Sequence, residues 1–307
     1  MWNVFISLGV VLLAGVLYRF VPGAPPATTV RSVISSIVLN VFVPLLTFGV
    51  VSTAPIGSEV WTVPAVSMAA VVVGFVLSWS TYAILLRRFL SRPAIGSLIL
   101  AGTWCNAMYL GLPISTAVVG IHVAKIPIMY DYMGMTPLLF TVGTIVCVEY
   151  GSRGERHTLA EGVAQTLRMP PLIAVVIALV VNLLHIDVPV WLSDACTSAG
   201  RAVAPLMLFS IGLALQLPNM RLAPLLAPAV LVRCVLVPVL LAPFAAMLIN
   251  NTDVYRTVML ETAMPTMMLT MVFADKYGLD ESVLAQAILL STLVAILTLP
   301  IVAQWTL

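Results

Sequence analysis

The chain is a succession of long apolar segments separated by short polar connections. The apolar segments cover approximately residues 2–21, 34–52, 60–86, 95–120, 126–148, 170–184, 189–215, 222–249, 254–274 and 282–302. Most are close to the ~20 residues that an α-helix needs to cross the hydrocarbon core of a bilayer. Pro, Gly and charged residues gather in the connections. The pattern predicts an all-α polytopic membrane protein with ten transmembrane helices.

Two of these segments are interrupted in their middles, at matching places in the two halves of the chain. The fourth segment contains Asn106, Gly111 and Pro113, and the ninth contains Glu261 and Pro265. Proline removes a backbone donor and clashes with the preceding turn, so each helix is predicted to kink or unwind there. The freed backbone groups must then be buried in protein or line a watery cavity. A proline kink can also serve packing alone, which leaves a structural interpretation open for each proline.

An internal repeat accompanies the paired interruptions. The second segment reads VFVPLLTFGV and the seventh AVAPLMLFSI, so that Pro44 aligns with Pro205. The polar connection 151–169 divides the chain into a first repeat, 1–150, and a second, 170–307. Because each half holds an odd number of segments, the two copies have opposite orientations. We expect an inverted-repeat architecture, in which substrate binds near the bilayer midplane between the repeats.

Composition and charge place the chain in a membrane. The 307 residues are 61% hydrophobic and only 8% charged, with a mean hydropathy of +1.12, whereas soluble domains carry about 25% charged residues. A net charge of +2 gives no reason to expect a nucleic-acid partner. The first apolar segment is too long for a cleavable signal peptide, and positive charge follows it instead of preceding it. We expect a single integral domain whose main partner is the lipid bilayer.

The loop charges predict the orientation of the chain in the membrane. On one side lie Arg19, Arg31, Arg87, Arg88, Arg92, Arg153, Arg156, Arg168, Arg221 and Lys276. Lys125 and Arg256 lie on the other side. Cytoplasmic loops carry the excess of Lys and Arg. The pattern therefore predicts a multi-pass protein of the cell (inner or plasma) membrane, with the 151–169 connection in the cytoplasm and both termini outside it.

The interrupted segments are the predicted binding site. Where a helix breaks, the half that follows presents backbone N–H groups and the half that precedes presents carbonyls, which suit an anion and a cation respectively. Asn106 adds an amide beside the first break, and Glu261 with Thr262 precedes Pro265. A carboxylate at bilayer depth is a functional candidate by default. Asn106 can instead hydrogen-bond two helices together, and Glu261 can lie nearer the interface.

Other polar groups inside the segments have two interpretations each. Arg233 and Arg201 could bind a substrate carboxylate in bidentate geometry, or pair with a structural partner. For Arg201 that partner could be Asp194, two helical turns before it. Asp131 could line the cavity and, with Glu261, is a candidate for binding the coupling ion. Its position near the end of its segment also allows a solvated carboxylate.

Several chemistries have no support in the sequence. The four cysteines, Cys105, Cys147, Cys196 and Cys234, show no CxxC spacing, so we interpret them as small buried hydrophobes. No HExxH, nucleophile–base constellation or GxxxxGK[ST] is present. We therefore expect neither a metal nor a cofactor, and neither an enzyme nor an ATP-driven pump.

Four stretches of the chain carry a family resemblance: NAMYLGLP at residues 106–113, APLMLFSIGLAL, ETAMPTMMLTMVFADKYGLDE and STLVAILTLP. Together they resemble the auxin efflux carrier family, which includes plant PIN-type carriers and bacterial dicarboxylate permeases. NAMYLGLP, residues 106–113, is similar to the family motif N-x-x-x-x-G-[LI]-P. APLMLFSIGLAL resembles its P-x-x-L-F-x-x-G-x-x-L element. ETAMPTMMLTMVFADKYGLDE and STLVAILTLP are similar to its ninth and tenth helices. The resemblance covers essentially the whole chain and is specific in combination.

The resemblance implies a fold and a function. It implies two inverted five-helix repeats with crossed broken helices 4 and 9, a scaffold of helices 1, 2, 6 and 7, and a mobile transport domain of helices 3–5 and 8–10. It also implies elevator-type motion and small organic anions as cargo. Asn106, Gly111 and Pro113 match the first crossover and Pro265 the second. The plant carriers have a long hydrophilic loop where this chain has its short connection, which favours a bacterial-type cargo such as malonate or malate over auxin.

The leading hypothesis is therefore a secondary transporter of mono- or dicarboxylates, driven by a proton, a sodium ion or the membrane potential. Such folds place their dimer surface on helices 1, 2, 6 and 7, so we expect a homodimer. The alternative is a sodium- or proton-coupled cation antiporter, or a bile-acid-type symporter, of the same fold. Those proteins would be expected to carry several carboxylates at the crossing, where the interrupted segments of this chain offer Glu261.

Overall fold

The structure is a computed structural model that describes residues 2–53, 57–152, 167–214 and 221–306. Within these ranges every regular element is a helix. Six helices are long and apolar enough to cross a membrane: Ala27–Thr53, Glu59–Leu85, Ile121–Tyr150, Val190–Ala214, Ala223–Leu248 and Glu281–Trp305. Shorter apolar helices are Ile6–Tyr18, Ala107–Val118 and Pro170–Leu183. The predicted all-α polytopic membrane protein is confirmed at this level, and the count of ten spanning helices stays a prediction.

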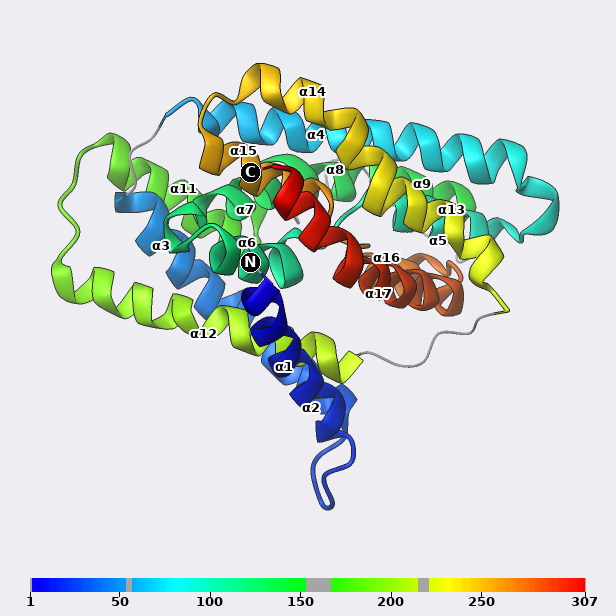
Figure 1. Cartoon of the computed structure of the whole chain (residues 1–307), viewed down its shortest axis with the longest axis horizontal. Coiled ribbons are helices and arrows are strands. Elements are labelled where there is room, and N and C mark those ends of the chain that lie inside the picture. Colours follow the sequence, from blue (N-terminus) through cyan, green and yellow to red (C-terminus); the bar gives the residue numbers. More distant parts are fainter. Residues whose placement is uncertain (1, 54–56, 153–166, 215–220, 307) are drawn as a thin grey trace.

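One group of helices packs mainly on itself. It consists of α1 (Trp2–Tyr18), α2 (Ala27–Ile37), α3 (Val43–Thr53), α11 (Pro170–Leu183) and α12 (Val190–Ala214). α1 packs along α12, α11 packs along α3, and α12 also contacts α2 and α3 (Figure 1). Gly15 and Gly212 bring α1 and α12 into backbone contact, because a Cβ at either position would overlap a carbonyl oxygen of the other helix. We call these helices the first group.

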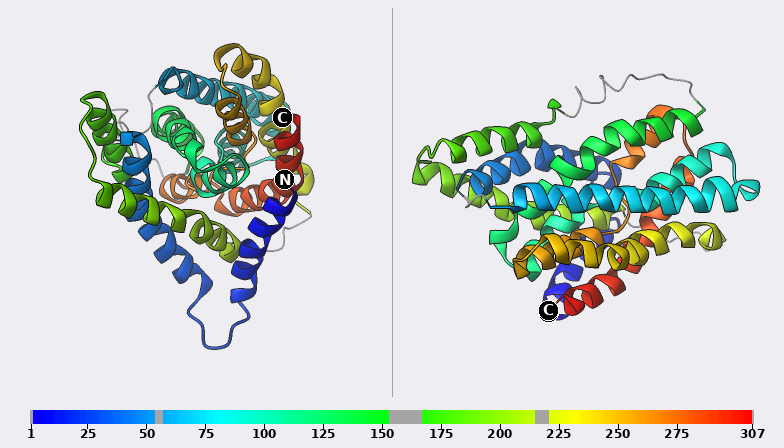
Figure 2. Two further views of the ribbon diagram at one scale, coloured as in Figure 1. Left: turned by 60° about the vertical axis from the view of Figure 1, so that its left-hand side comes forward. Right: turned by 90° about the horizontal axis from the view of Figure 1, so that it is seen from above.

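A second group surrounds the larger buried core. It includes α4 (Glu59–Trp79), α5 (Arg92–Thr103), α13 (Ala223–Leu231), α14 (Val237–Leu248) and α17 (Glu281–Trp305). α7 (Lys125–Met129), α8 (Thr136–Leu138) and α9 (Thr144–Tyr150) follow one another along the segment 121–150. α4 runs beside α14 and packs on α5, while α17 contacts α5 and α13 (Figures 1 and 2).

Apolar side chains cover much of the outer surface. Val10 on α1, Val72 on α4, Leu240 on α14 and Leu297 on α17 are all more than half exposed. Soluble proteins rarely expose contiguous apolar surface on this scale. The exposed residues therefore need a hydrocarbon solvent, which agrees with the membrane class indicated by the composition.

Several helices pass through a wide, π-helical turn. Such turns occur at 38–42, 80–85, 107–111, 130–135, 139–143 and 232–236. π-Turns are rare in helices and are frequent at functional sites. Two of them carry a fully or almost fully buried carboxylate or guanidinium, Asp131 and Arg233 respectively. Two of the wide turns thus hold a carboxylate and a guanidinium in the interior of the protein, where an ionisable group is costly.

The predicted connection 151–169 lies largely outside the described residues, which omit 153–166 and with them Arg153 and Arg156. The division into repeats 1–150 and 170–307 stays a prediction.

Candidate site at the crossing of two interrupted helices

The first interruption separates α5 from the helical stretch that follows it. α5 ends at Thr103, residues 104–106 are not helical, and helix resumes at residue 107 in a π-turn that leads into α6 (Leu112–Val118). The side-chain oxygen of Asn106 accepts a hydrogen bond from the Tyr109 N–H at 3.3 Å and so caps the new helix. The sequence pattern placed this break around Gly111 and Pro113, several residues too late. Pro113 follows the π-turn, at the second position of α6, inside the helix that resumes at residue 107.

The second interruption lies where the sequence predicts it. α15 (Thr252–Thr262) ends, residues 263–269 are not helical, and α16 (Thr270–Tyr277) begins. Pro265 stands inside the interruption. The Ala263 N–H still bonds back to the last turn of α15, so the helix closes before the chain turns away.

The two interrupted segments lie against each other, backbone to backbone. The Asn106 N–H donates to the Pro265 carbonyl at 2.7 Å, and the Met267 N–H donates to the Trp104 carbonyl at 2.9 Å. Cys105 and Thr266 form the antiparallel bridge between these bonds. Peptide groups freed by one break are thus paired with those freed by the other, which is how irregular backbone persists at membrane depth.

On one face of the crossing, the carbonyl ends of two helices meet a buried arginine. The Arg233 Nη1 donates to the carbonyl of Thr103 at 2.9 Å, and its Nη2 donates to the carbonyl of Thr262. Thr103 and Thr262 are the last residues of α5 and α15. Arg233 is fully buried in the π-turn between α13 and α14. We call this the carbonyl face of the crossing.

On the other face, the starts of the two following helices line a small cavity. Its volume is about 50 Å³, close to the space of one or two water molecules. It is lined by Leu39, Asn106, Met108, Tyr109, Asp131, Tyr132, Thr136, Met169, Met267 and Leu269. Asn106 to Tyr109 open one helix, and Met267 and Leu269 immediately precede the other. We call this the amide face, because unpaired N–H groups gather where helices begin.

A carboxylate also lines this cavity. Asp131 is 2% exposed and its Oδ1 accepts a hydrogen bond from the Thr136 hydroxyl at 2.9 Å. Asp131 is therefore not the solvated carboxylate that its place near the end of a segment allowed. Leu39 lies in the π-turn between α2 and α3, and Met169 lies just before α11. Residues that adjoin the first group of helices therefore complete the wall of the cavity.

Glu261 lies between the two faces and is fully buried. Its Oε1 accepts a hydrogen bond from the Ser115 hydroxyl at 2.7 Å, while its Oε2 has no hydrogen-bond partner among the described residues. A Cβ at Gly111 would overlap this Oε2, so glycine is required for the approach. The carboxyl of Glu261 therefore packs against the first interrupted segment, inside the protein.

Comparison with known proteins decides the family. A family model described as a membrane transport protein matches residues 25–303. The chain belongs to this family, the auxin efflux carriers. An uncharacterized transporter of Methanothermobacter thermautotrophicus is 26% identical over 88% of this chain and 87% of its own length. An uncharacterized transporter of Methanocaldococcus jannaschii is 24% identical over 69% of this chain and 67% of its own length.

The remaining predicted residues of this transporter lie away from the cavity. Arg201 and Asp194 are exposed on α12, while Pro44 and Pro205 belong to α3 and α12 of the first group. The sequence pattern did not single out six other residues that line the cavity: Leu39, Met108, Tyr109, Met169, Met267 and Leu269. For Met108, Tyr109, Met267 and Leu269 the available signal was their place just after, or within, an interruption.

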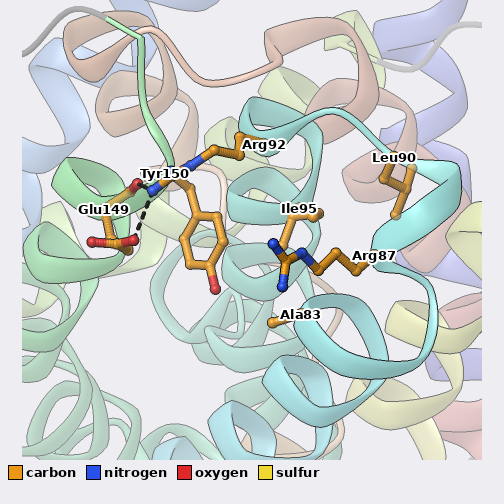
Figure 3. Close-up of a pocket in the computed structure, with 7 residues that line it drawn as sticks. All are labelled: Ala83, Arg87, Leu90, Arg92, Ile95, Glu149 and Tyr150. Atoms are coloured by element: carbon orange, nitrogen blue, oxygen red, sulfur yellow. Dashed lines mark hydrogen bonds and ion pairs between the residues drawn. The ribbon is translucent and has the colours of Figure 1, made fainter.

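A larger cavity, of about 300 Å³, lies at the ends of α4, α5 and α9. Figure 3 shows Arg87, Arg92, Glu149 and Tyr150 around it. Arg92 pairs with Glu149 at 2.7 Å, but both side chains are about two-thirds exposed, at 66% and 65%. Exposed ion pairs of this kind contribute little. Buried polar groups gather instead at the helix crossing, which is the candidate transport site.

Proposed function

We propose that this transporter is a secondary active carrier of small organic anions, mono- or dicarboxylates, bound at the amide face of the crossing. The observation that carries the proposal is the cavity at which two interrupted helices resume, with Asn106 on its wall. Helix N-termini carry partial positive charge, equivalent to about half an elementary charge each. They bind carboxylates without a charged side chain, and half-helices of transporters use them in this way.

Coupling to protons follows from the carboxylate on the cavity wall. A cargo anion placed beside an ionised Asp131 would be repelled in a site with little water. Asp131 must therefore bind a proton when the cargo binds, and release it when the cargo leaves. Glu261, the other predicted coupling residue, is sealed against Ser115 and Gly111 and is less well placed to exchange protons. Proton–anion symport is the mode that this arrangement favours.

The movement that we propose is of the elevator type. The chain would form ten transmembrane helices as two inverted five-helix repeats, with helices 1, 2, 6 and 7 as scaffold and helices 3–5 and 8–10 as the transport domain. The separate packing of the first group, α1 to α3 with α11 and α12, supports this division. The cavity wall, completed by residues that adjoin the first group, suits a site that opens as one group slides past the other. Widening is needed, because the cavity is smaller than a dicarboxylate.

We also propose a membrane location, a topology and an oligomeric state for the carrier. We propose that it resides in the cell (inner or plasma) membrane with both termini outside the cytoplasm, as a homodimer joined through its scaffold helices. Membership of a transporter family also favours carriage over catalysis, so we propose no enzymatic activity.

A second function has one observation in its favour. Asp131 on the cavity wall would suit a cation as well as a proton, as in a cation antiporter of the same fold. In that case the cavity would bind a cation in exchange for protons, and carboxylates would not compete for it.

Counterflow in proteoliposomes tests the proposal. Vesicles loaded with one unlabelled mono- or dicarboxylate are diluted into a trace of the same labelled compound, and a panel of such acids is compared with protein-free vesicles. The proposal expects transient accumulation of the label for at least one small carboxylate, which a channel cannot produce. Accumulation for none of the acids, together with proton release on addition of Na⁺ or K⁺, would favour the antiporter instead.

A variant at the sealed carboxyl separates the two coupling candidates. Glu261→Gln keeps the hydrogen bond with Ser115 possible and removes the ionisable group. We expect counterflow of the identified acid to persist with unchanged pH dependence. Loss of the pH dependence in this variant would assign the proton to Glu261.

A further inference from the structure

The carbonyl face of the crossing contains a cation that belongs to the chain. The guanidinium of Arg233 donates to the last carbonyl of α5, at Thr103, and to the last carbonyl of α15, at Thr262. Thr103 and Thr262 are 130 and 29 positions away from Arg233 in the sequence, respectively. One side chain therefore joins the C-terminal ends of both interrupted helices, from a π-turn in a third helix.

No carboxylate neutralises this guanidinium within the part of the chain that the structure describes. The ion pairs found there include those of Arg92 with Glu149, His122 with Asp253, and Lys125 with Glu59, and none of them involves Arg233. Arg233 is fully buried, and an unpaired buried charge is very costly. Its partners are therefore the two helix ends, each of which carries partial negative charge equivalent to about half an elementary charge.

Two converging helix C-termini form a place for a cation. In transporters with interrupted helices, the C-terminal ends and unwound carbonyls coordinate the coupling Na⁺. Here the guanidinium of Arg233 already donates hydrogen bonds to the two terminal carbonyls. A second cation at these oxygens would meet the charge of Arg233.

We propose that Arg233 is a built-in cation that replaces a coupling sodium ion at the crossing, so that the two interrupted helices are held together without Na⁺. Arg233 is thus a positioning residue: it fixes the two helix ends whose continuations line the cargo cavity. The proposal deepens the proposed function, since it assigns the coupling away from sodium. It concerns the cargo-free protein and can be tested without a known cargo.

The test compares melting temperatures of the purified, cargo-free protein in NaCl and in choline chloride of equal ionic strength. Four proteins are needed: wild type, Arg233→Gln, Arg233→Lys and, as a matched control, the exposed Arg92→Gln. Gln removes the charge and leaves room for a small ion, whereas Lys keeps a cation beside the carbonyls. A merely structural role for the side chain would produce no dependence on the salt cation.

For wild type, Arg233→Lys and Arg92→Gln, we expect the melting temperature of each protein to be the same in NaCl as in choline chloride. In choline chloride, Arg233→Gln should melt about 5 °C or more below the wild type, because two buried carbonyls lose their donor. In NaCl it should recover at least part of this difference. Stabilisation of the wild type by Na⁺ would overturn the proposal. So would Arg233→Gln that melts like wild type or shows no preference for Na⁺.

If Arg233→Gln does not fold in either salt, uptake by the wild type decides. Counterflow that continues undiminished with choline in place of Na⁺ on both sides supports the built-in cation, and counterflow that requires Na⁺ contradicts it. Either result leaves the identity of the cargo, and hence the proposed function, as a separate outcome.

Discussion

Two helices end on one face of the crossing, and on the other face their continuations begin. On the carbonyl face the exposed peptide groups are satisfied by the chain itself, through Arg233 and through Thr266, whose hydroxyl donates to the Ala101 carbonyl at 2.8 Å. On the amide face Asn106 caps one helix start, and a cavity remains beside it. The same interruption thus produces one closed face and one face open to a ligand.

The difference has a physical consequence for substitutions. Removing a group from the carbonyl face leaves buried peptide oxygens without donors, so the cost should fall on stability. Removing a group from the amide face disturbs a small cavity, so the cost should fall on cargo binding. A substitution that displaces a buried group between the two faces should affect both stability and cargo binding.

The largest effect is expected at Gly111, which lies between the faces. In Gly111→Ala the new methyl group displaces the Glu261 carboxyl from its fully buried position. We expect the free energy of unfolding, measured by SDS titration, to fall by about 1–3 kcal/mol. Counterflow should fall by about tenfold or more, because a shift of about 1 Å at a binding site is costly.

Gly9→Ala is the matched control, since a Cβ at Gly9 meets nothing within 4 Å. It should change unfolding by no more than about 0.5 kcal/mol. Equal behaviour of the two alanine variants would show that Glu261 moves freely and that the crossing tolerates its displacement.

A change in pH dependence is expected at Asp131 on the amide face. If cargo binds only when Asp131 is protonated, uptake by the wild type rises as the pH on the cargo side is lowered over the range in which the protein stays folded. Asn is permanently neutral and of the same shape, so Asp131→Asn should bind cargo equally across this range. A wild-type rate independent of pH would argue against proton symport.

A smaller effect on stability is expected at Thr266 on the carbonyl face. Thr266→Val keeps the shape and removes the donor to the Ala101 carbonyl. Unfolding free energy should decrease by about 1 kcal/mol, while the KM for cargo remains within about twofold. Thr53→Val is the control, because Thr53 is exposed and its hydroxyl bonds only within its own helix. A large rise in KM with unchanged stability would mean that the two faces are not distinct in function.

The smallest effect is expected at Arg92, far from the crossing. Arg92→Gln breaks an exposed ion pair with Glu149, so we expect a loss of no more than about 0.5 kcal/mol and unchanged counterflow. Arg233→Gln makes the same chemical change at a buried position. Comparable losses at the two arginines would contradict the role assigned to the carbonyl face.

Part of this site is visible in the sequence. Pro265, Asn106 and Glu261 are conspicuous because proline, amide and carboxylate groups are costly in an apolar segment. Their presence indicates both the interrupted helices and their importance. All three lie at or beside the crossing in the structure.

Other parts depend on contacts that local sequence does not encode. The first helix breaks at 104–106, ahead of Gly111 and Pro113, because residues 104–106 pair with the second interruption, more than 150 residues away. Arg233 is recognisable as an intramembrane charge, but its partners are backbone carbonyls, which any residue carries. Met108 and Met267 look like ordinary apolar residues, and only their position after or within a break distinguishes them.

The most direct test of the amide face is a comparison of two asparagines. Asn106→Ala removes the side chain at the cavity wall, while Asn40→Ala removes an exposed amide that bonds only to Ser36. We would measure the half-saturating concentration of the acid identified by counterflow for each variant. A rise of about tenfold or more for Asn106→Ala, with Asn40→Ala unchanged, is the predicted result. An unchanged value for Asn106→Ala in a folded protein would contradict cargo binding at the crossing.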